Sequence, residues 1–244
     1  MKSTIFAGRN IKEIVRDPVS IIMGLCFPVG LIIVLSLMKK SIGSMADIFE
    51  VQNFAPSMTI FGLAFLGMFL GTLMSNDRNS SFLTRLFASP LKSVDYILGY
   101  SLPILPMAII QGTLCFITAI IMGLPLNINV IYGILSLLPV ALLFISFGLF
   151  MGSVLNTASQ VSGFGTILIN SAVFLSGAVI PLDSIGGTFK QVCDLLPFVH
   201  ANSIVNLAVA GNFTNILPHF LWLIGYSLIL AIPSIIVFKK KMKK

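Results

Sequence analysis

YILGYSLPILPMAIIQGTLCFITAIIM, residues 96–122, opens the stretch of sequence that decides the fold, and it contains no Asp, Glu, Lys or Arg. The same absence of charge continues through residue 182. Over the whole chain only 9% of residues are charged and 57% are hydrophobic, and the mean hydropathy is +1.02. A soluble domain carries about 25% charged residues. The sequence therefore predicts an integral membrane protein.

Six apolar runs are long enough to cross a membrane, because a hydrocarbon core about 30 Å thick takes about 20 helical residues. They cover residues 19–38, 51–75, 97–122, 130–155, 161–180 and 216–238. No polar stretch between them is long enough to fold alone. The predicted fold class is an all-α integral membrane protein with six transmembrane helices, in which residues 1–244 form one transmembrane domain.

Prolines and glycines mark special positions in these runs. Pro28 is tolerable inside a membrane helix because neighbouring groups can satisfy the freed carbonyl. Pro103 and Pro106 predict a kink or a broken first turn in the third run. Two GxxxG patterns, residues 67–71 and 148–152, favour close helix contacts, although glycine is common in membrane helices and one such pattern is a weak signal.

Residues 1–18 have the pattern of an amphipathic helix. The charged residues of one face are Arg9, Lys12, Glu13 and Arg16, and apolar residues at 11, 14 and 15 fall on the opposite face. Such a helix lies in the headgroup layer, with its cations toward anionic lipid or a protein partner. It is not predicted to be a signal peptide, because the following apolar run is too long and no cleavage site follows it.

A polar island, NDRNSSFLTRLFASPLKSVD at residues 76–95, separates the second and third runs. Its apolar residues recur at the spacing of one helix face: Phe82, Leu83, Leu86 and Phe87. Asn79 or Ser80 is predicted to cap the start of this short helix, and Pro90 to end it. Two interpretations stay open, an ordinary interfacial loop helix and a docking surface for a soluble partner.

Residues 181–215, between the fifth and sixth runs, are predicted to form an outer cap. One amphipathic helix ends at Pro197, and the apolar stretch 199–210 is too short to span a membrane. Two interfacial or re-entrant helices are therefore expected.

The distribution of Lys and Arg orients the chain, because cytoplasmic loops carry an excess of both. Six spans place both termini on one side. That side holds the cations of residues 1–18, the island and the C-terminal lysines, whereas the other side holds Lys39, Lys40 and Lys190. Both termini and the island are predicted to be cytoplasmic. The formal net charge of +7 is therefore a membrane-orientation signal, and no nucleic-acid partner is expected.

The sequence lacks the residues that several membrane-protein functions require. No charged residue lies within a predicted span, which disfavours a proton- or ion-coupled carrier. His200 and His219 fall near the outer side, where a lone histidine is normally just solvated. The sequence has no HExxH, no GxSxG and no GxxxxGK[ST], and its cysteines are scattered. We expect no catalytic, cofactor or metal site, and the chain has the features of a transport machine whose ATPase is a separate subunit.

Gln111 and Asn170 are the most polar candidates for lining a transport path. An equally good interpretation is that both form hydrogen bonds between helices. The polar and apolar lining suits an amphipathic or hydrophobic cargo better than a free ion.

Taken together, these segments resemble the permease subunits of ABC exporters of the second type. RNIKEIVRDP at 9–18 is similar to the connecting helix of that family, and NFAPSM at 53–58 to the start of its second span. Asp77-Arg78 and LTRLFASP at 83–90 resemble its coupling-helix segment. SGAVIPL at 176–182 and LLPFVHAN at 195–202 resemble the signature after the fifth span. Two positions depart from the family pattern: Asp77 replaces the usual Glu, and Ser80-Ser81 replaces a Gly-Thr-like pair.

The resemblance implies partners and a mechanism. Two permease copies, as a homodimer or heterodimer, would pair across their first and fifth spans in a bacterial inner membrane. Two ATPase subunits, which bind ATP and Mg, would receive the coupling helices and drive export of a drug, antibiotic, peptide, lipid or glycan. The implied coupling residues are Ser81, Phe82, Leu83, Thr84, Arg85, Leu86, Phe87 and Ala88. The implied outer-cap residues are Ser176, Gly177, Pro181, Pro197, His200 and Asn202.

Two alternatives remain at this point. A stand-alone carrier or channel would transport solute without ATP or a partner. A membrane protein of immunity or assembly would transport nothing even beside an ATPase.

Overall fold

The structure is a computed structural model that describes residues 2–42, 50–80, 93–177 and 182–241. Within these ranges every regular element is a helix, which confirms the predicted all-α fold. The helices are α1 (Lys2–Arg16), α2 (Pro18–Ile21), η1 (Ile22–Cys26), α3 (Phe27–Ile42), α4 (Val51–Asn79), α6 (Ser93–Ser101), α7 (Ile104–Ile121), α8 (Asn129–Val154), α9 (Ala158–Phe174), α10 (Leu182–Ile185), α11 (Gly187–Leu195), α12 (Pro197–Ala210) and α13 (Ile216–Lys241).

Five helical segments in the described ranges are long and apolar enough to cross a membrane. They are Pro18–Lys39, Val51–Asn79, Val94–Ile121, Asn129–Val154 and Ile216–Lys240. A sixth is reached if α11 and α12, which meet at 82°, count as one broken span. The expected fifth span is α9, which has 17 residues and ends earlier than the predicted range 161–180. A turn at Gly177, where φ is +77°, follows its end.

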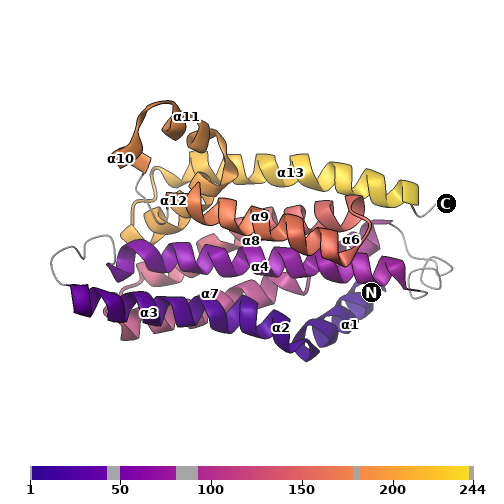
Figure 1. Ribbon diagram of the computed structural model, residues 1–244, viewed down its shortest axis with the longest axis horizontal. Helices are drawn as coiled ribbons and strands as arrows, with labels where there is room; N and C mark the ends of the chain where they lie inside the picture. The colour runs from indigo at the N-terminus through magenta and orange to yellow at the C-terminus, as the bar shows by residue number, and fades with distance from the viewer. Residues whose placement is uncertain (1, 43–49, 81–92, 178–181, 242–244) are drawn as a thin grey trace.

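The long helix α4 lies at the centre of the bundle (Figure 1). It packs against α8, α9, α7 and α3, and most of its residues are buried, including Leu63, Leu66 and Leu70. The two ends of the chain lie at the same end of the bundle, and α10 and α11 lie at the opposite end (Figure 1). This arrangement matches an even number of crossings.

The two GxxxG patterns pack against each other where α4 crosses α8. A methyl group built on Gly148 would lie 2.1 Å from the carbonyl oxygen of Gly67, and one on Gly67 would lie 2.5 Å from the carbonyl oxygen of Phe144. Methyl groups on Gly71 and Gly152 would come within 2.8 Å and 2.9 Å of the facing backbone. The backbones therefore touch, which confirms the close contact that the patterns predict.

Prolines shape the first and third membrane helices. The π-helical turn η1 lies directly before Pro28, which has no N–H to donate and whose ring displaces the carbonyl one turn earlier. The third helix is divided into α6 and α7 just where Pro103 precedes Ile104. Both irregularities follow from proline chemistry in the sequence.

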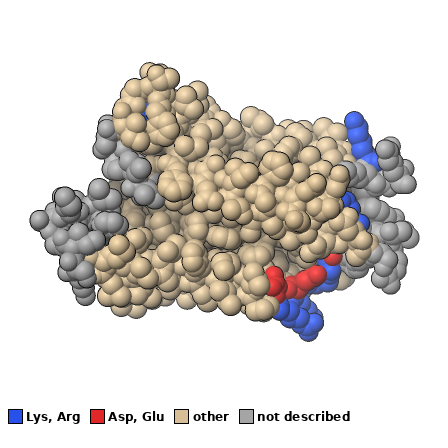
Figure 2. All heavy atoms as spheres, viewed as in Figure 1, with Lys and Arg blue, Asp and Glu red and all other residues tan. Residues whose placement is uncertain are grey.

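Charged side chains gather at the end of the bundle that holds the termini. Figure 2 shows basic and acidic side chains near α1 and basic ones at the end of α13, whereas the visible flank of the bundle between the two ends carries none. The other end carries fewer: Lys190 in α11, and Lys39 of α3, which lies 3.6 Å from the carboxylate of Glu50. This asymmetry is the physical basis of the predicted orientation, and the orientation itself stays a prediction.

Candidate functional site

The candidate site is the junction where α1 meets the end of α4 and the beginning of α6. Phe6 of α1 is buried and makes edge-to-face ring contacts with Tyr96 and Tyr100 of α6, at centroid distances of 6.0 Å and 5.0 Å. A methyl group on Gly99 would lie 2.1 Å from the Phe6 ring, so only glycine leaves room for this contact. Asn10 is fully buried, and its side-chain amide donates a hydrogen bond to the carbonyl of Gly99 at 3.0 Å.

A buried ion pair joins α1 to α4. The two guanidinium nitrogens of Arg9 donate to the carboxylate of Asp77 at 2.5 Å and 2.8 Å, a bidentate geometry. The Tyr100 hydroxyl donates to the same carboxylate at 2.8 Å. The side chain of Asp77 is 5% exposed and that of Arg9 is 34% exposed. We call these three residues the Arg9–Asp77–Tyr100 cluster, and it ties together three helices.

Glu13 completes the cluster on its exposed side. Its carboxylate lies 2.5 Å from the Arg9 guanidinium, one helical turn further along α1. Partial burial lowers the pKa of Arg9, but the hydrogen bond and charge of Asp77 outweigh this, so the net pKa lies above its ordinary value. Burial, together with the nearby charge of Asp77, raises the pKa of Glu13 despite its pairing with Arg9. Burial and the like charge of Asp77 therefore act on Glu13 more strongly than its pairing with Arg9.

Arg78 ties the end of α4 to the end of α8. Its guanidinium donates to the carbonyls of Gly152 at 2.9 Å and Ser153 at 3.0 Å, and also to the carbonyl of Leu155. These are carbonyls of the last helical turn, which have no partner within the helix and carry the negative end of its dipole. The Asn79 amide adds a bond to the carbonyl of Asn156 at 2.9 Å.

Residues 81–88, the predicted coupling helix, lie outside the described residues. The described chain approaches them through Asp77–Ser80 and leaves them through α6, and both approaches carry members of the cluster. Asn79 is the last residue of α4, which extends beyond the predicted end at residue 75. Asn79 is therefore not the cap of a helix that begins at residue 81, and of the two predicted caps only Ser80 remains.

In the structure, the four charged residues predicted to share one face of α1 have different surroundings. Arg9 belongs to the cluster and Glu13 pairs with Arg9, whereas Lys12 and Arg16 are exposed. These four side chains and Asp17 border a surface hollow of about 710 Å³. The opposite face was predicted to be apolar, but the buried stripe of α1 contains Phe6, Asn10 and Ile14, while the apolar residues at 11 and 15 are exposed.

At the other end of the bundle, α12 inserts between α4, α8 and α13. Pro197 begins α12, where a missing N–H costs nothing. The Ser57 hydroxyl donates to the Asn202 side-chain oxygen at 2.9 Å, and the Asn202 amide donates to the carbonyl of Ser176 at 3.2 Å. Asn202 thus joins α4 to the turn after α9. Gly177 follows in that turn, and Pro181 lies outside the described residues.

His200 is buried, so the expectation of a solvated histidine is wrong. Its Nδ1 lies 2.8 Å from the Nδ1 of His219, and its ring stacks on Trp222 at 4.9 Å. Packing of α12 against α13 brings the two rings together and buries His200, which the sequence spacing of the two histidines does not reveal.

The two candidates for a transport path have different surroundings. Gln111 is fully buried, and its amide donates to the carbonyl of Thr59 at 3.0 Å, a bond between α7 and α4. This matches the interhelix interpretation. Asn170 is exposed on α9, where its amide donates to the carbonyl of Thr166 at 2.8 Å. A path-lining role stays a prediction for both.

Sequence reasoning missed Phe6, Asn10 and Tyr100. Asn10 and Asp77 stand within the motifs that carry the family resemblance, but nothing in their spacing shows that they meet. Among the described residues no three His, Cys, Asp or Glu side chains lie close enough to hold a metal ion together.

Comparison with known proteins adds the family. A family model described as "ABC-2 type transporter" matches residues 3–208. The chain is also similar to two proteins called Nodulation protein J. The one from Rhizobium leguminosarum bv. viciae is 23% identical over 138 residues, which cover 56% of this chain and 53% of the relative. The one from Rhizobium meliloti (strain 1021) is 24% identical over 118 residues, or 48% and 45%. The matches thus span about half the length of each relative.

The family match includes α1, α4, α6 and the cluster that joins them, together with the turn after α9 and most of α12. The helical bundle, the membrane-length helices and this match agree with one another, and the chain belongs to the ABC-2 type transporter family as a multi-pass membrane component.

Proposed function

We propose that this chain is the membrane-spanning permease subunit of an ATP-driven exporter. The observation that carries the proposal is the Arg9–Asp77–Tyr100 cluster, in a chain of the ABC-2 family. The cluster holds α1 against both helices that flank residues 81–92. A segment that receives a push from a soluble partner must be fixed at both ends if it is to move the helices behind it.

The end of α4 is bonded to three neighbouring helices. Asp77 faces α1 and α6, and the neighbouring Arg78 faces the end of α8. A displacement of residues 81–88 would therefore act on α4, the central helix, and through its glycine contact on α8. Helices packed as closely as α4 and α8 are expected to move together, because a packed core does not deform continuously.

The energy source would lie on a partner. In the proposed assembly a separate ABC ATPase subunit binds ATP and Mg, and this chain supplies the docking helix at residues 81–88 and forms the path. The apolar residues of that helix would bury area in the ATPase, at roughly 1.5–3 kcal/mol for each large side chain before ordering costs. Arg85 would pair with an acidic group at the rim.

A second permease copy, identical or related, would complete the path, and α9 would take part in the pairing. The cargo class is an amphipathic or hydrophobic molecule such as a drug, antibiotic, peptide, lipid or glycan. The expected location is the bacterial inner membrane with both termini cytoplasmic.

The test is co-purification from native membranes. The tagged chain is solubilised in mild detergent, and proteins retained in stoichiometric amounts are identified by mass spectrometry. We expect an ABC ATPase, and we expect Leu86→Asp to lose it because a carboxylate cannot enter an apolar cleft unpaired. The matched control is Leu126→Asp, since Leu126 is 79% exposed and lies between α7 and α8; this variant should retain the ATPase.

Other results would identify the alternatives. A chain that purifies alone and transports solute in vesicles without ATP is a stand-alone carrier or channel. A chain that retains an ATPase but gives no ATP-dependent efflux is a protein of immunity or assembly. Equal loss of the ATPase in both variants would show unfolding instead of a lost docking surface.

A further inference from the structure

The two histidines of the chain face each other at the end of the bundle opposite the chain termini. His200 lies in the first turn of α12, which begins directly after α11, and His219 lies in the first turn of α13. Their Nδ1 atoms are 2.8 Å apart, and their ring centroids are 5.0 Å apart. His200 is buried, and its Nε2 has no close hydrogen-bond partner among the described residues. The contact with His219 is therefore the close hydrogen bond of this ring.

A separation of 2.8 Å between two ring nitrogens requires one hydrogen between them. Two neutral imidazoles meet this requirement when one carries its hydrogen on Nδ1 and the other on Nε2. One added proton preserves the bond, because an imidazolium is a stronger donor to a neutral imidazole than a neutral ring is. Two added protons would place N–H against N–H and two positive charges side by side. The pair can therefore hold at most one added proton without separating.

The geometry favours a shared hydrogen over a bound metal ion. A tetrahedral zinc ion with bonds of about 2.0–2.1 Å would hold two imidazole nitrogens about 3.3 Å apart, further than the 2.8 Å found here. In the part of the chain that the structure describes, no third His, Cys, Asp or Glu joins the pair to complete a metal site.

The surroundings of His200 favour the first added proton. Trp222 stacks on its ring at a centroid distance of 4.9 Å and an interplanar angle of 14°, and the face of an indole attracts a cation. Asp194 of α11 adds a negative charge that acts on the same ring. Other ionisable side chains on the helices that pack against α12 are Tyr132 of α8, Lys190 and Cys193 of α11, Tyr226 of α13 and, at the far end of the bundle, Asp77 and Arg78 of α4 and the lysines of α13.

We propose that the His200–His219 pair is an acid-sensitive switch, which holds α12 to α13 until a second proton binds and then releases it. The unfolded chain takes up both protons without this repulsion, so the contact is present at neutral pH and is lost as pH falls. The pair lies on the side predicted to be outside the cell, and it would respond to the pH there. This regulation goes beyond the proposed transport function.

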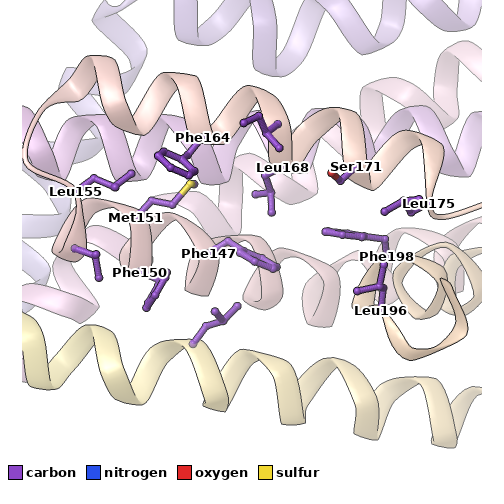
Figure 3. A pocket seen from close by; sticks show the side chains of 13 residues that line it. Phe147, Phe150, Met151, Leu155, Phe164, Leu168, Ser171, Leu175, Leu196 and Phe198 are labelled. Carbon is purple, nitrogen blue, oxygen red and sulfur yellow. The ribbon is translucent and has the colours of Figure 1, made fainter. Parts of the chain in front are cut away.

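The ring that a movement of α12 would displace is Phe198, two residues before His200. Phe198 stacks on Phe147 of α8 at a centroid distance of 6.1 Å and an angle of 18°. Both rings line an apolar cavity of about 570 Å³ beside α8, where Phe198 and Leu196 lie at one end (Figure 3). Release of α12 would therefore open or reshape that end of the cavity.

The first test observes the shared hydrogen by nuclear magnetic resonance. Because the chain has two histidines, labelling histidine with nitrogen-15 gives signals from these two rings alone, and the unchanged protein is studied in lipid nanodiscs. At pH 8 we expect one ring with Nδ1–H, the other with Nε2–H, and a scalar coupling across the N–H···N bond. On acidification the rings should titrate in two separate steps, and the coupling should disappear in the second. Identical tautomers that titrate independently would overturn the proposal.

The second test is a double-mutant cycle of His200→Phe and His219→Phe, followed by detergent unfolding at pH 8 and pH 4. Phe keeps an aromatic ring beside Trp222 but has no nitrogen. At pH 8 the two positions should be coupled by about fivefold in the unfolding equilibrium constant, and at pH 4 the coupling should vanish or change sign. The matched control is Tyr226→Phe, which removes the 2.7 Å bond from the Tyr226 hydroxyl to the Leu195 carbonyl and should have the same effect at both pH values.

Two results of the cycle would contradict the switch. No coupling at pH 8 would show that the rings do not share a hydrogen, and equal coupling at both pH values would show that acid does not separate them. Neither test needs an ATPase or a cargo, so their failure is distinct from failure of the proposed transport function.

Discussion

Replacing Asp77 by Asn tests the cluster that the proposed function depends on. The carboxylate accepts two bonds from Arg9, at 2.5 Å and 2.8 Å, and one from Tyr100 at 2.8 Å. Asn has the same shape but one acceptor oxygen, and its NH₂ group would face a second donor. Because the side chain is 5% exposed, water cannot replace the lost partner.

Breaking a buried ion pair costs about 3–5 kcal/mol in the free energy of unfolding. The cost here should be smaller, because the Arg9 side chain is 34% exposed and keeps Glu13 at 2.5 Å. We expect Asp77→Asn to lower the free energy of unfolding by about 2–3 kcal/mol. The double variant Arg9→Gln/Asp77→Asn should lose less than the sum of the two single variants, because neither partner is left charged and unpaired.

The measurement is unfolding of the detergent-solubilised chain by added sodium dodecyl sulfate, followed by circular dichroism. The matched control is Glu13→Gln, which breaks the exposed contact of the same guanidinium and should cost about 0–1 kcal/mol. Equal losses for Asp77→Asn and Glu13→Gln would refute the reasoning. So would additivity in the double variant, since it would show that the two side chains do not interact in the membrane protein.

Three further predictions follow from particular contacts. Gly148→Ala should lower the free energy of unfolding by about 3 kcal/mol or more, because the new methyl group meets the carbonyl of Gly67 at 2.1 Å. The control Gly225→Ala has nothing within 4 Å of the new methyl group and should be neutral or slightly stabilising. Similar values for the two variants would contradict the close crossing of α4 and α8. Glu13 has a raised pKa in the folded protein, so the folded state binds more protons and its stability falls as pH rises from the ordinary value of 4.5 through the raised one. The stability of Glu13→Gln relative to the unchanged protein should therefore improve between pH 4 and pH 7 in the same unfolding assay. A constant difference would be inconsistent with this shift. Asn202→Leu should lower the free energy of unfolding by about 1–3 kcal/mol, because it leaves the Ser57 hydroxyl and the Ser176 carbonyl without their partner. Full stability of this variant would show that these two bonds are not needed to hold α12.

Most of the fold could be predicted because it depends on patterns within single segments. The charge-free run 96–182 requires membrane burial, and run length sets helix length. Proline chemistry correctly marks the break before α7 and the start of α12. The helix ends were less accurate: α4 continues to Asn79 because Arg78 and Asn79 bind the end of α8, which the local sequence does not encode.

The sequence indicated which segments form the candidate site but not which residues in those segments contact one another. Arg9 and Asp77 each stand in a motif with a family resemblance, yet they are 68 residues apart, and their bond appears only when α1 packs across α6. The same is true of His200 and His219, and of the two GxxxG patterns, each of which could have faced lipid or another helix.

The sequence by itself therefore determined that this protein is a helical membrane component, how long most of its helices are, and which end carries its charge. These properties depend on the hydropathy and charge of consecutive residues, which decide whether a segment enters the bilayer. Only the tertiary structure decided which glycines touch, which carboxylate receives Arg9, and where an apolar cavity remains beside α8. These depend on the relative rotation of helices about their axes, and in lipid that rotation is set by side-chain packing between helices and not by hydrophobicity, because lipid is as apolar as the helices themselves.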